Sequence, residues 1–254
     1  RGYKEAGQWT PAYDPKDFTN DTDWIDAITR IAPYQNYNVS ASSSDKGLNW
    51  YASLAFTDTE GIVKDTGYQR VTGRFNFSKD FTSWLNVALK ISTNYKRKDM
   101  SKAVFSGSGY SNGAIYLSPV IGEMDESNPF VDNGALINTP VASIKYEDYY
   151  STGWANTDVL EFTIKPFKGF TLKSQNSVRL AQDHTYHFWS NKLPKRRDEE
   201  GADAYKYEKE DMLLSTENTA TYKTRIDKRH SIEAMAGFSA SALKAMNTSV
   251  KAEG

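Results

Sequence analysis

The sequence predicts an all-β protein, and specifically part of a transmembrane antiparallel β-barrel. Three observations indicate this class. Apolar and polar residues alternate along about eight segments of roughly ten residues, a length that suits a tilted strand crossing a bilayer. The connections between these segments alternate between short and long, which is typical of outer-membrane barrels. Aromatic residues lie near the segment ends, where an interfacial belt is expected.

The composition excludes several other classes of protein. Among the 254 residues, 31 Lys and Arg oppose 32 Asp and Glu, so there is no broad basic face for nucleic acid. Cysteine is absent, which removes disulfides, thiolate nucleophiles and Cys-based zinc sites. No apolar run reaches the length of a membrane helix, whereas alternating barrel strands average to a polar mean hydropathy such as the −0.66 found here. The chain starts without an apolar leader, and we expect any export signal to lie outside it.

Residues 1–33 are predicted to form an extracellular loop with one short helix. Pro11 and Pro15 interrupt regular structure. Asp21 or Thr22 is the predicted N-cap of an apolar-spaced run, and Pro33 is the predicted stop.

From residue 34 to residue 254 the apolar period is two, which predicts the strands of a barrel wall. The first turn contains Gly47, which can take a positive φ. Four hairpins are predicted, over residues 34–57, 68–95, 157–182 and 212–243. The long connections are predicted at about 58–67, 96–156 and 183–211.

The two faces of these strands differ in chemistry. One face is rich in Phe, Leu, Val and Ala, as lipid contact requires. Charged residues lie in mid-strand on the other face, where a barrel would direct them into a wet lumen and a soluble sandwich would expose them to water: Arg70, Arg74, Lys90, Lys165, Lys173, Arg179, Glu217 and Glu233. The predicted membrane-interface aromatics are Trp50, Trp84, Tyr95, Phe167 and Tyr222.

Five sequence segments carry a family resemblance: in order, they are TDWIDAI at 22–28, APYQNYNVS at 32–40, WYASLAF at 50–56, EGIVK at 60–64 and YQRVTGRFN at 68–76. These segments resemble the SusC/RagA-like family of TonB-dependent outer-membrane transporters, and the close resemblance covers about residues 21–95. The resemblance implies a barrel of about 22 strands closed by a plug. It also implies uptake of glycans or peptides across the outer membrane of a Gram-negative bacterium, with energy from TonB and a SusD-like surface lipoprotein as partner. We expect the plug and the TonB box to lie outside this chain, which would be an internal piece of the barrel wall.

Catalytic motifs are absent from the sequence, and we expect no enzyme activity. His184 and His187 would lie on opposite faces of a strand end, so solvated loop histidines are a better interpretation than metal ligands. No cofactor is expected; a weak calcium candidate comprises the loop carboxylates Asp198, Glu199, Glu200 and Asp203.

Aromatic side chains in the longest predicted connection are candidate contacts for a substrate or the partner lipoprotein, because flat amphipathic rings stack on sugars and bury large areas. The alternative is that they pack the loop against itself. These residues are Tyr110, Tyr116, Tyr146, Tyr149, Tyr150 and Trp154.

Two other functions remain open at this point. A passive porin or a surface adhesin barrel would use the same strand pattern without energy coupling. A carbohydrate-binding β-sandwich would press the apolar faces of two sheets together.

Overall fold

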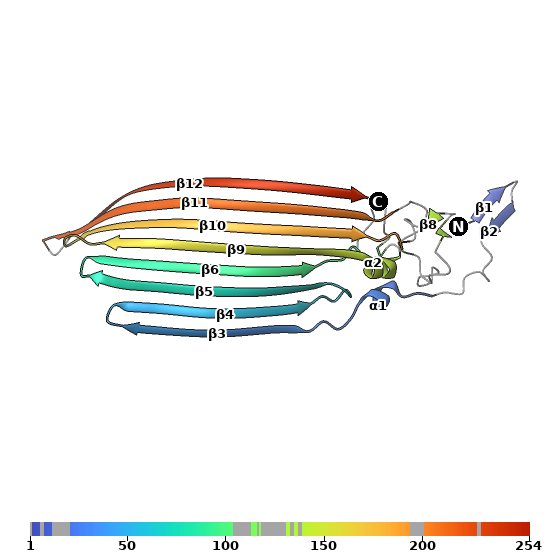
Figure 1. The fold of residues 1–254 in the computed structure, drawn as a ribbon, viewed down its shortest axis with the longest axis horizontal. Helices are drawn as coiled ribbons and strands as arrows, with labels where there is room; N and C mark the ends of the chain where they lie inside the picture. The colour runs from blue at the N-terminus through green and yellow to red at the C-terminus, as the bar shows by residue number, and fades with distance from the viewer. Residues whose placement is uncertain are drawn as a thin grey trace.

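The main feature of the computed structural model is one antiparallel sheet of eight strands (Figure 1). Its strand order is β12-β11-β10-β9-β6-β5-β4-β3. The structure describes residues 2–5, 8–11, 21–103, 113–115, 117, 131–132, 135–136, 139–193, 201–227 and 230–254. The sheet strands are β3 (Tyr34–Asp45), β4 (Leu48–Glu60), β5 (Gly67–Thr82), β6 (Leu85–Asp99), β9 (Glu147–Ile164), β10 (Phe170–Trp189), β11 (Asp203–Ile226) and β12 (His230–Glu253).

Six short elements complete the described structure. They are the two-stranded sheets β1 (Gly2–Glu5) with β2 (Gln8–Pro11) and β7 (Val131–Asp132) with β8 (Ala135–Leu136), and the helices α1 (Trp24–Ile28) and α2 (Pro140–Tyr146). In the described part of the chain no helix has the length and apolar character needed to cross a membrane.

Both outer strands of the sheet, β3 and β12, are paired on one side only within the described residues. The sheet is therefore an open wall rather than a closed barrel. The predicted partial antiparallel barrel of about eight strands is confirmed, and each of the four predicted hairpins is present.

The connections differ between the two ends of the sheet. The tight links of the four hairpins lie at one end, which we name the short-turn end, and α1, α2 and the longer connections lie at the other, the long-loop end (Figure 1). Gly47 has a φ of 76°, as the first predicted turn requires.

The strands extend further toward the long-loop end than the sequence predicts. Strand β9 begins at Glu147 rather than near residue 157, β10 continues to Trp189, and β11 already begins at Asp203. The predicted connections 96–156 and 183–211 were therefore too long. Toward the long-loop end, charged residues and aromatic rings lie on both faces of these strands, so period-two alternation disappears. The pairing of the backbones nevertheless continues, for example between Glu147 and Trp189.

The register of the sheet separates two faces. Leu89 lies directly opposite Phe77 on β5 and Leu160 on β9, and Phe77 lies opposite Trp50 on β4. We call the side that carries this row the apolar face. The opposite side carries Arg74, Lys90, Glu161 and Arg179, and we call it the polar face.

The apolar face is less uniform than the sequence predicts, because polar side chains occupy part of it on β9, β10 and β11. Thr216 donates to Asn176 Oδ1 (2.9 Å), and Asn218 Nδ2 donates to Thr216 Oγ1 (3.0 Å). On β9, Asn156 Nδ2 donates to Asp158 Oδ2 (2.7 Å). These hydrogen bonds between neighbouring side chains reduce the cost of placing polar atoms on a face that would otherwise be apolar.

Helix α1 differs in its limits from the sequence prediction. Asp23, rather than Asp21 or Thr22, is the N-cap, since its Oδ1 accepts from the backbone N–H groups of Ile25 (3.0 Å) and Asp26 (3.1 Å). The helix ends at Ile28, well before Pro33, because Thr29 leaves the helix to form a β-bridge with Val63.

A small hydrophobic core lies beneath α1 at the long-loop end. Trp24 and Ile28 are buried there against three other residues, Ala103, Ala114 and Leu117. Segments far apart in the sequence are thus joined where the strands end.

Gly169 provides a test of the short-turn geometry. Its φ is +87°, and a β-carbon there would lie 2.3 Å from the carbonyl oxygen of Lys223. We expect Gly169→Val to destabilise the β9–β10 turn by at least about 1–3 kcal/mol from the backbone strain alone. The measurement is the temperature at which the intact protein loses its folded migration on a semi-denaturing gel. Gly73→Ala is the control, because a β-carbon there meets Thr93 Cγ2 at an ordinary 3.4 Å; equal losses in both variants would contradict this account.

Candidate functional site

The polar face carries cross-strand ion pairs. Lys96 Nζ lies 2.8 Å from Asp183 Oδ1, although β9 runs between their strands. Glu161 Oε2 lies 3.0 Å from Lys173 Nζ and 3.6 Å from Lys90 Nζ, and the Glu161 side chain is 13% exposed. These contacts link β6, β9 and β10 on the face where the sequence predicts lumenal charges.

Gly153 makes the Lys96–Asp183 pair possible. This glycine lies directly opposite both residues in the register. A β-carbon at Gly153 would lie 2.3 Å from Lys96 Cε and 2.4 Å from Asp183 Oδ1. The missing side chain therefore leaves the space through which the ion pair closes over β9.

Arginines on the same face lack this compensation. Arg70, Arg74 and Arg179 are exposed, and no carboxylate lies within ion-pair distance of them among the residues that the structure describes. The polar face therefore combines neutralised lysines with arginines that remain available.

At the long-loop end, the polar face holds a stacked group around His187. The imidazole lies between the rings of Tyr149 (centroid separation 4.3 Å) and Trp189 (3.6 Å). Its Nε2 is 2.9 Å from Glu147 Oε2, and Lys102 Nζ lies over Tyr149 at 5.8 Å. Because His187 is only 3% exposed, the interpretation of it as a solvated loop histidine is wrong; the extended pairing of β9 with β10 buries it.

His184 lies on the other face of β10, as its spacing from His187 predicts. Its Nδ1 is 3.2 Å from Glu208 Oε1 on β11. No group of three or more His, Asp or Glu side chains that could hold a metal occurs within the described residues. Of the calcium candidates, Asp203 begins β11, whereas Asp198, Glu199 and Glu200 lie outside the described residues.

The structure does not gather the predicted contact aromatics into one loop. Tyr146 ends α2, whereas Tyr149, Tyr150 and Trp154 belong to β9. Tyr149 lies on the polar face, but Tyr150 points to the other side, where it lies near Tyr186 (5.3 Å) and beneath Arg97 (4.6 Å). Tyr110 and Tyr116 lie outside the described residues.

Trp154 lies directly opposite Tyr95, on the apolar face. These rings are 39% and 49% exposed. The sequence predicts a loop at Trp154, because the alternation pattern does not show that β9 begins seven residues earlier. The signal that relates Trp154 to Tyr95 is the register between β6 and β9, which joins residues about sixty positions apart.

The other predicted interface aromatics lie toward the short-turn end. Trp84 (48% exposed), Phe167 (60%) and Tyr222 (43%) occupy strand ends or links there, and Phe167 stacks on Phe170 at 5.0 Å. Trp50 lies two residues from the start of β4. Together with Tyr95 and Trp154, these residues place aromatic rings at both ends of the apolar band.

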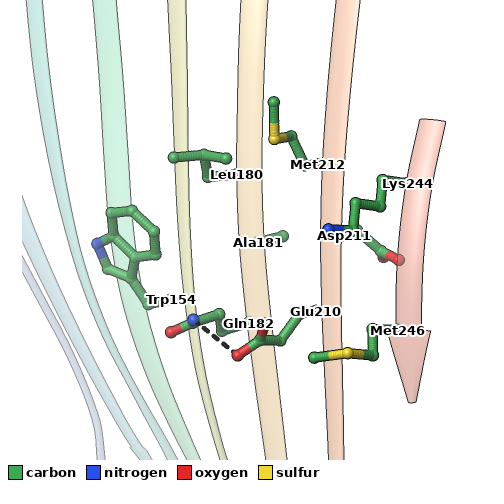
Figure 2. A pocket seen from close by; sticks show the side chains of 9 residues that line it. All are labelled: Trp154, Leu180, Ala181, Gln182, Glu210, Asp211, Met212, Lys244 and Met246. Atoms are coloured by element: carbon green, nitrogen blue, oxygen red, sulfur yellow. Dashed lines mark hydrogen bonds between the residues drawn. The ribbon is translucent and has the colours of Figure 1, made fainter. Parts of the chain in front are cut away.

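A hollow of about 230 Å³ lies beside Trp154 on the apolar face (Figure 2). Trp154, Leu180 and Met212 supply apolar surface, and Gln182 Nε2 donates to Glu210 Oε1 (3.1 Å) on the floor. Lys244 and Met246 of β12 form its far side. The hollow thus lies where the apolar band meets polar side chains.

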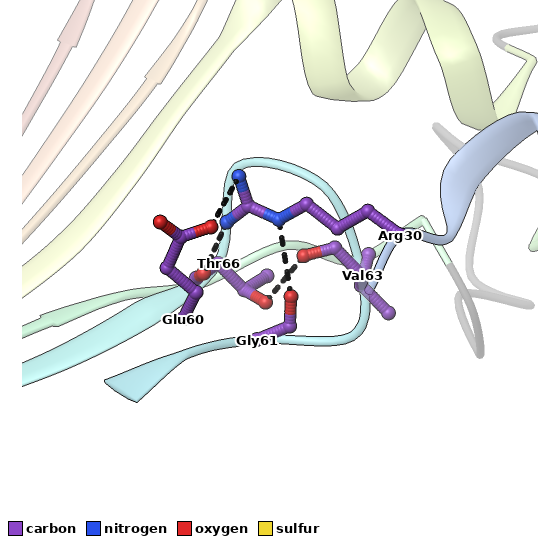
Figure 3. A network of polar contacts seen from close by, with 5 residues as sticks. All are labelled: Arg30, Glu60, Gly61, Val63 and Thr66. Carbon is purple, nitrogen blue, oxygen red and sulfur yellow. Dashed lines mark hydrogen bonds and ion pairs between the residues drawn. The ribbon is translucent and has the colours of Figure 1, made fainter. Parts of the chain in front are cut away.

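At the long-loop end, Arg30 fastens the connection between β4 and β5 to the segment that follows α1 (Figure 3). Its Nε donates to the carbonyl oxygen of Gly61 (3.2 Å) and its Nη2 to that of Thr66 (3.1 Å). Its Nη1 pairs with Glu60 at 3.0 Å. Thr66 Oγ1 also donates to the carbonyl oxygen of Val63 (2.7 Å). The turn is therefore held both by its own hydrogen bond and by those from Arg30.

Asp65 lies in the same connection among other carboxylates. Partial burial raises the pKa of Asp65 above its ordinary value, and Asp99 and Asp148 raise this pKa further, whereas Arg30 lowers it. The ionised form is therefore disfavoured in the folded loop.

Removing the arginine tests its contribution to the loop. We expect Arg30→Ala to lower the free energy of local opening at residues 61–66 by about 1–3 kcal/mol, because the variant loses two hydrogen bonds that the charged guanidinium donates. Hydrogen exchange at the Gly61 and Lys64 amides measures this. Lys64→Ala is the control, since it removes one hydrogen bond, to the carbonyl oxygen of Ala27; a larger effect of the control would contradict the role of Arg30.

The Asp65 carboxyl predicts a pH dependence of the same loop. Since its pKa is raised on folding, it contributes stability below an ordinary Asp pKa of about 4, and this contribution is lost as the pH rises through the raised pKa. At pH 7 we expect slower exchange at the Gly61 amide in Asp65→Asn than in the wild type, and no difference near pH 3.5. Asp45→Asn in the first short turn is the control. Slower exchange in the wild type at pH 7 would reverse the sign.

Comparisons with known proteins find relatives over most of this chain. It is 24% identical over 232 residues to the TonB-dependent receptor P26 of Formosa agariphila, covering 89% of this chain and 23% of that protein. It is 28% identical over 116 residues to the TonB-dependent receptor SusC of Bacteroides thetaiotaomicron, covering 46% of this chain and 11% of SusC. No family model matches the sequence.

Solved structures with the same fold include the RagAB peptide transporter, with a TM-score of 0.78 and 24% identity over 92% of this chain and 27% of that chain. The chain spans about a quarter or less of the length of the proteins that it matches. The predicted resemblance to SusC-like TonB-dependent transporters is thereby confirmed.

Proposed function

We propose that this chain is part of the barrel wall of a SusC-like, TonB-dependent importer in the outer membrane of a Gram-negative bacterium. The observation that carries the proposal is the continuous eight-stranded register with one apolar and one charged face. The relatives named TonB-dependent receptors support the energy coupling.

The apolar face is the one that suits lipid. Leu54 and Phe75 are 55% and 38% exposed on it, because no second layer of the described residues covers this face. Aromatic rings at both ends of the band suit the two membrane–water interfaces. The spacing between Tyr95 and the short-turn aromatics then defines the part of the wall that crosses the hydrocarbon.

The polar face suits a wet lumen. Ion pairs such as Lys96–Asp183 and Lys173–Glu161 bridge strands on it. A water-filled interior would also solvate the arginines that have no carboxylate partner among the described residues. Cargo would pass along this face, so that the wall itself performs no chemistry and needs no cofactor.

The long-loop end would then be extracellular and the short-turn end periplasmic. The connections at the long-loop end are held by the Arg30 contacts and by the core under α1, and they would form the surface that receives a SusD-like lipoprotein. RagAB is a peptide transporter by its name, and oligosaccharides or peptides are the proposed cargo here. Among the predicted contact residues of β9, Tyr149 is the one that would face the lumen, whereas Trp154 is better placed in the interfacial belt.

The competing functions differ in one observable respect each. A β-sandwich requires two stacked sheets, but the long described strands form a single one. A passive porin uses the same wall without TonB, so energy coupling separates it from an importer.

Uptake by cells that express the intact protein tests the proposal. We expect growth on the imported oligosaccharide or peptide to require both the full-length transporter and a functional TonB system. Cells that lack TonB but retain the transporter are the decisive comparison. Undiminished uptake in those cells would identify a passive pore instead.

Lipid exposure of the wall is tested at Leu89, which lies between Phe77 and Leu160 in mid-band. We expect Leu89→Arg to destabilise the inserted barrel by about 2–4 kcal/mol, because a charge would enter the bilayer midplane. Leu54→Arg should act in the same direction. The measurement is the yield of full-length protein in the outer membrane and its folded gel migration.

Gln175→Arg is the matched control, since Gln175 lies on the polar face opposite Glu161 and Glu217, one residue from the row of Leu89. We expect it to insert normally. Equal yields for Leu89→Arg and Gln175→Arg would refute the assignment of the two faces.

A further inference from the structure

Between mid-band and the level of the Tyr95–Trp154 pair, the polar face of β5, β6 and β10 carries more positive than negative charge. We name this area the basic midsection and define it by five residues of β5, β6 and β10: Arg70, Arg74, Lys90, Lys96 and Arg179. They share one face, because Arg70 lies opposite Lys96, and a single row across the sheet runs from Arg74 through Ser92 and Thr157 to Arg179.

The lysines of the basic midsection are compensated within the sheet. Lys96 pairs with Asp183 at 2.8 Å, and Lys90 approaches Glu161 at 3.6 Å. The three arginines have no such carboxylate among the residues that the structure describes. Arg70 also lies directly opposite Lys96, an arrangement of like charges that destabilises a strand pair. Their positive charge is therefore available to a molecule outside the sheet.

The side chains between Arg74 and Arg179 are small and polar. Ser92 and Thr157 occupy the two intervening positions of the row. Three strand spacings separate the two arginines, roughly 14 Å at the usual distance between strands. One extended molecule can therefore contact both guanidinium groups while its hydroxyl or amide groups meet Ser92 and Thr157.

Arginine is the side chain suited to oxyanions. Its planar fork donates two parallel hydrogen bonds to a carboxylate, sulfate or phosphate, and it stays charged at all physiological pH values. A channel lined by one sign of charge also concentrates ligands of the opposite sign. A neutral cargo would gain neither this charge attraction nor the paired hydrogen bonds of an oxyanion.

We propose that the basic midsection binds anionic groups of the transported cargo, and that this importer therefore takes an oligomer bearing carboxylates or sulfates. This inference rests on the proposed function, in which the polar face lines the transport path. An acidic segment of the same protein is the other conceivable partner. It is disfavoured because the centre of a protein interface is usually apolar, whereas Ser92 and Thr157 form the centre here.

The experiment uses the intact transporter, purified in detergent with its lipoprotein partner, and calorimetric titration with defined probes. Hexagalacturonate and a sulfated hexasaccharide represent anionic sugars, hexaglutamate represents an acidic peptide, and maltohexaose is the neutral probe. We expect at least one anionic probe to bind more tightly than maltohexaose, with affinity that falls as salt rises. The probe that binds identifies sugar or peptide as the source of the anion.

The variant Arg74→Gln with Arg179→Gln should weaken that binding by at least about tenfold and flatten its salt dependence. Replacing the same two arginines by lysine should restore only part of the affinity, because the charge returns without the bidentate fork. Arg225→Gln is the matched control, since Arg225 lies on the same face of β11 near the short-turn end, far from this row. It should leave the affinity unchanged.

Three outcomes would overturn the inference. One is binding of no anionic probe, and another is an equal loss for maltohexaose. The third is a lower melting temperature of the ligand-free double variant with unchanged probe affinity, which would show that the arginines hold another segment of the protein. These readouts do not depend on TonB, so failure of the importer proposal in the cellular uptake test remains distinguishable from failure here.

Discussion

The constraint on which this structure depends is the antiparallel register of eight long strands. Because side chains alternate between faces with a period of two, a slip of one residue would exchange the two surfaces completely. The observed register aligns Phe77, Leu89 and Leu160 on one side and Arg74 and Arg179 on the other. It also satisfies the backbone hydrogen bonds between strands, which a hydrocarbon environment makes obligatory. Both the lipid-facing role and the lumenal role that we propose depend on this one arrangement.

The same register explains where the faces depart from simple alternation. On the apolar face, Asn176, Thr216 and Asn218 become neighbours across β10 and β11 and bond to one another. On the polar face, Gly153 leaves space for Lys96 to reach Asp183 across β9. In each case a side chain that looks misplaced in one strand is accommodated by residues of the next. Pairwise compensation across strands is therefore a recurring solution in this wall.

The two ends of the sheet serve different purposes. At the short-turn end, tight links such as that at Gly169 hold the hairpins together. At the long-loop end, the Arg30 contacts and the stacking of His187 between Tyr149 and Trp189 order longer connections. The proposed importer would need this asymmetry, because cargo would be captured on one side of the membrane only. In that proposal the ordered connections would supply a defined surface there, and the arginine row would continue it into the lumen.

The sequence by itself determined the class of fold, the four hairpins and the resemblance to SusC-like transporters, because alternation and turn residues are local properties. Tertiary structure decided what depends on distant partners. The strands continue beyond the apolar band because β9 pairs with β10, and this pairing buries His187. The pairing of β6 with β9 places Trp154 opposite Tyr95. Asp23 caps α1 because the helix begins at Trp24, one residue later than a cap at Thr22 would place it. Which strands lie side by side likewise decides that Asp183 compensates Lys96, and that no carboxylate of the described residues compensates Arg74. Local sequence does not show which strands become neighbours.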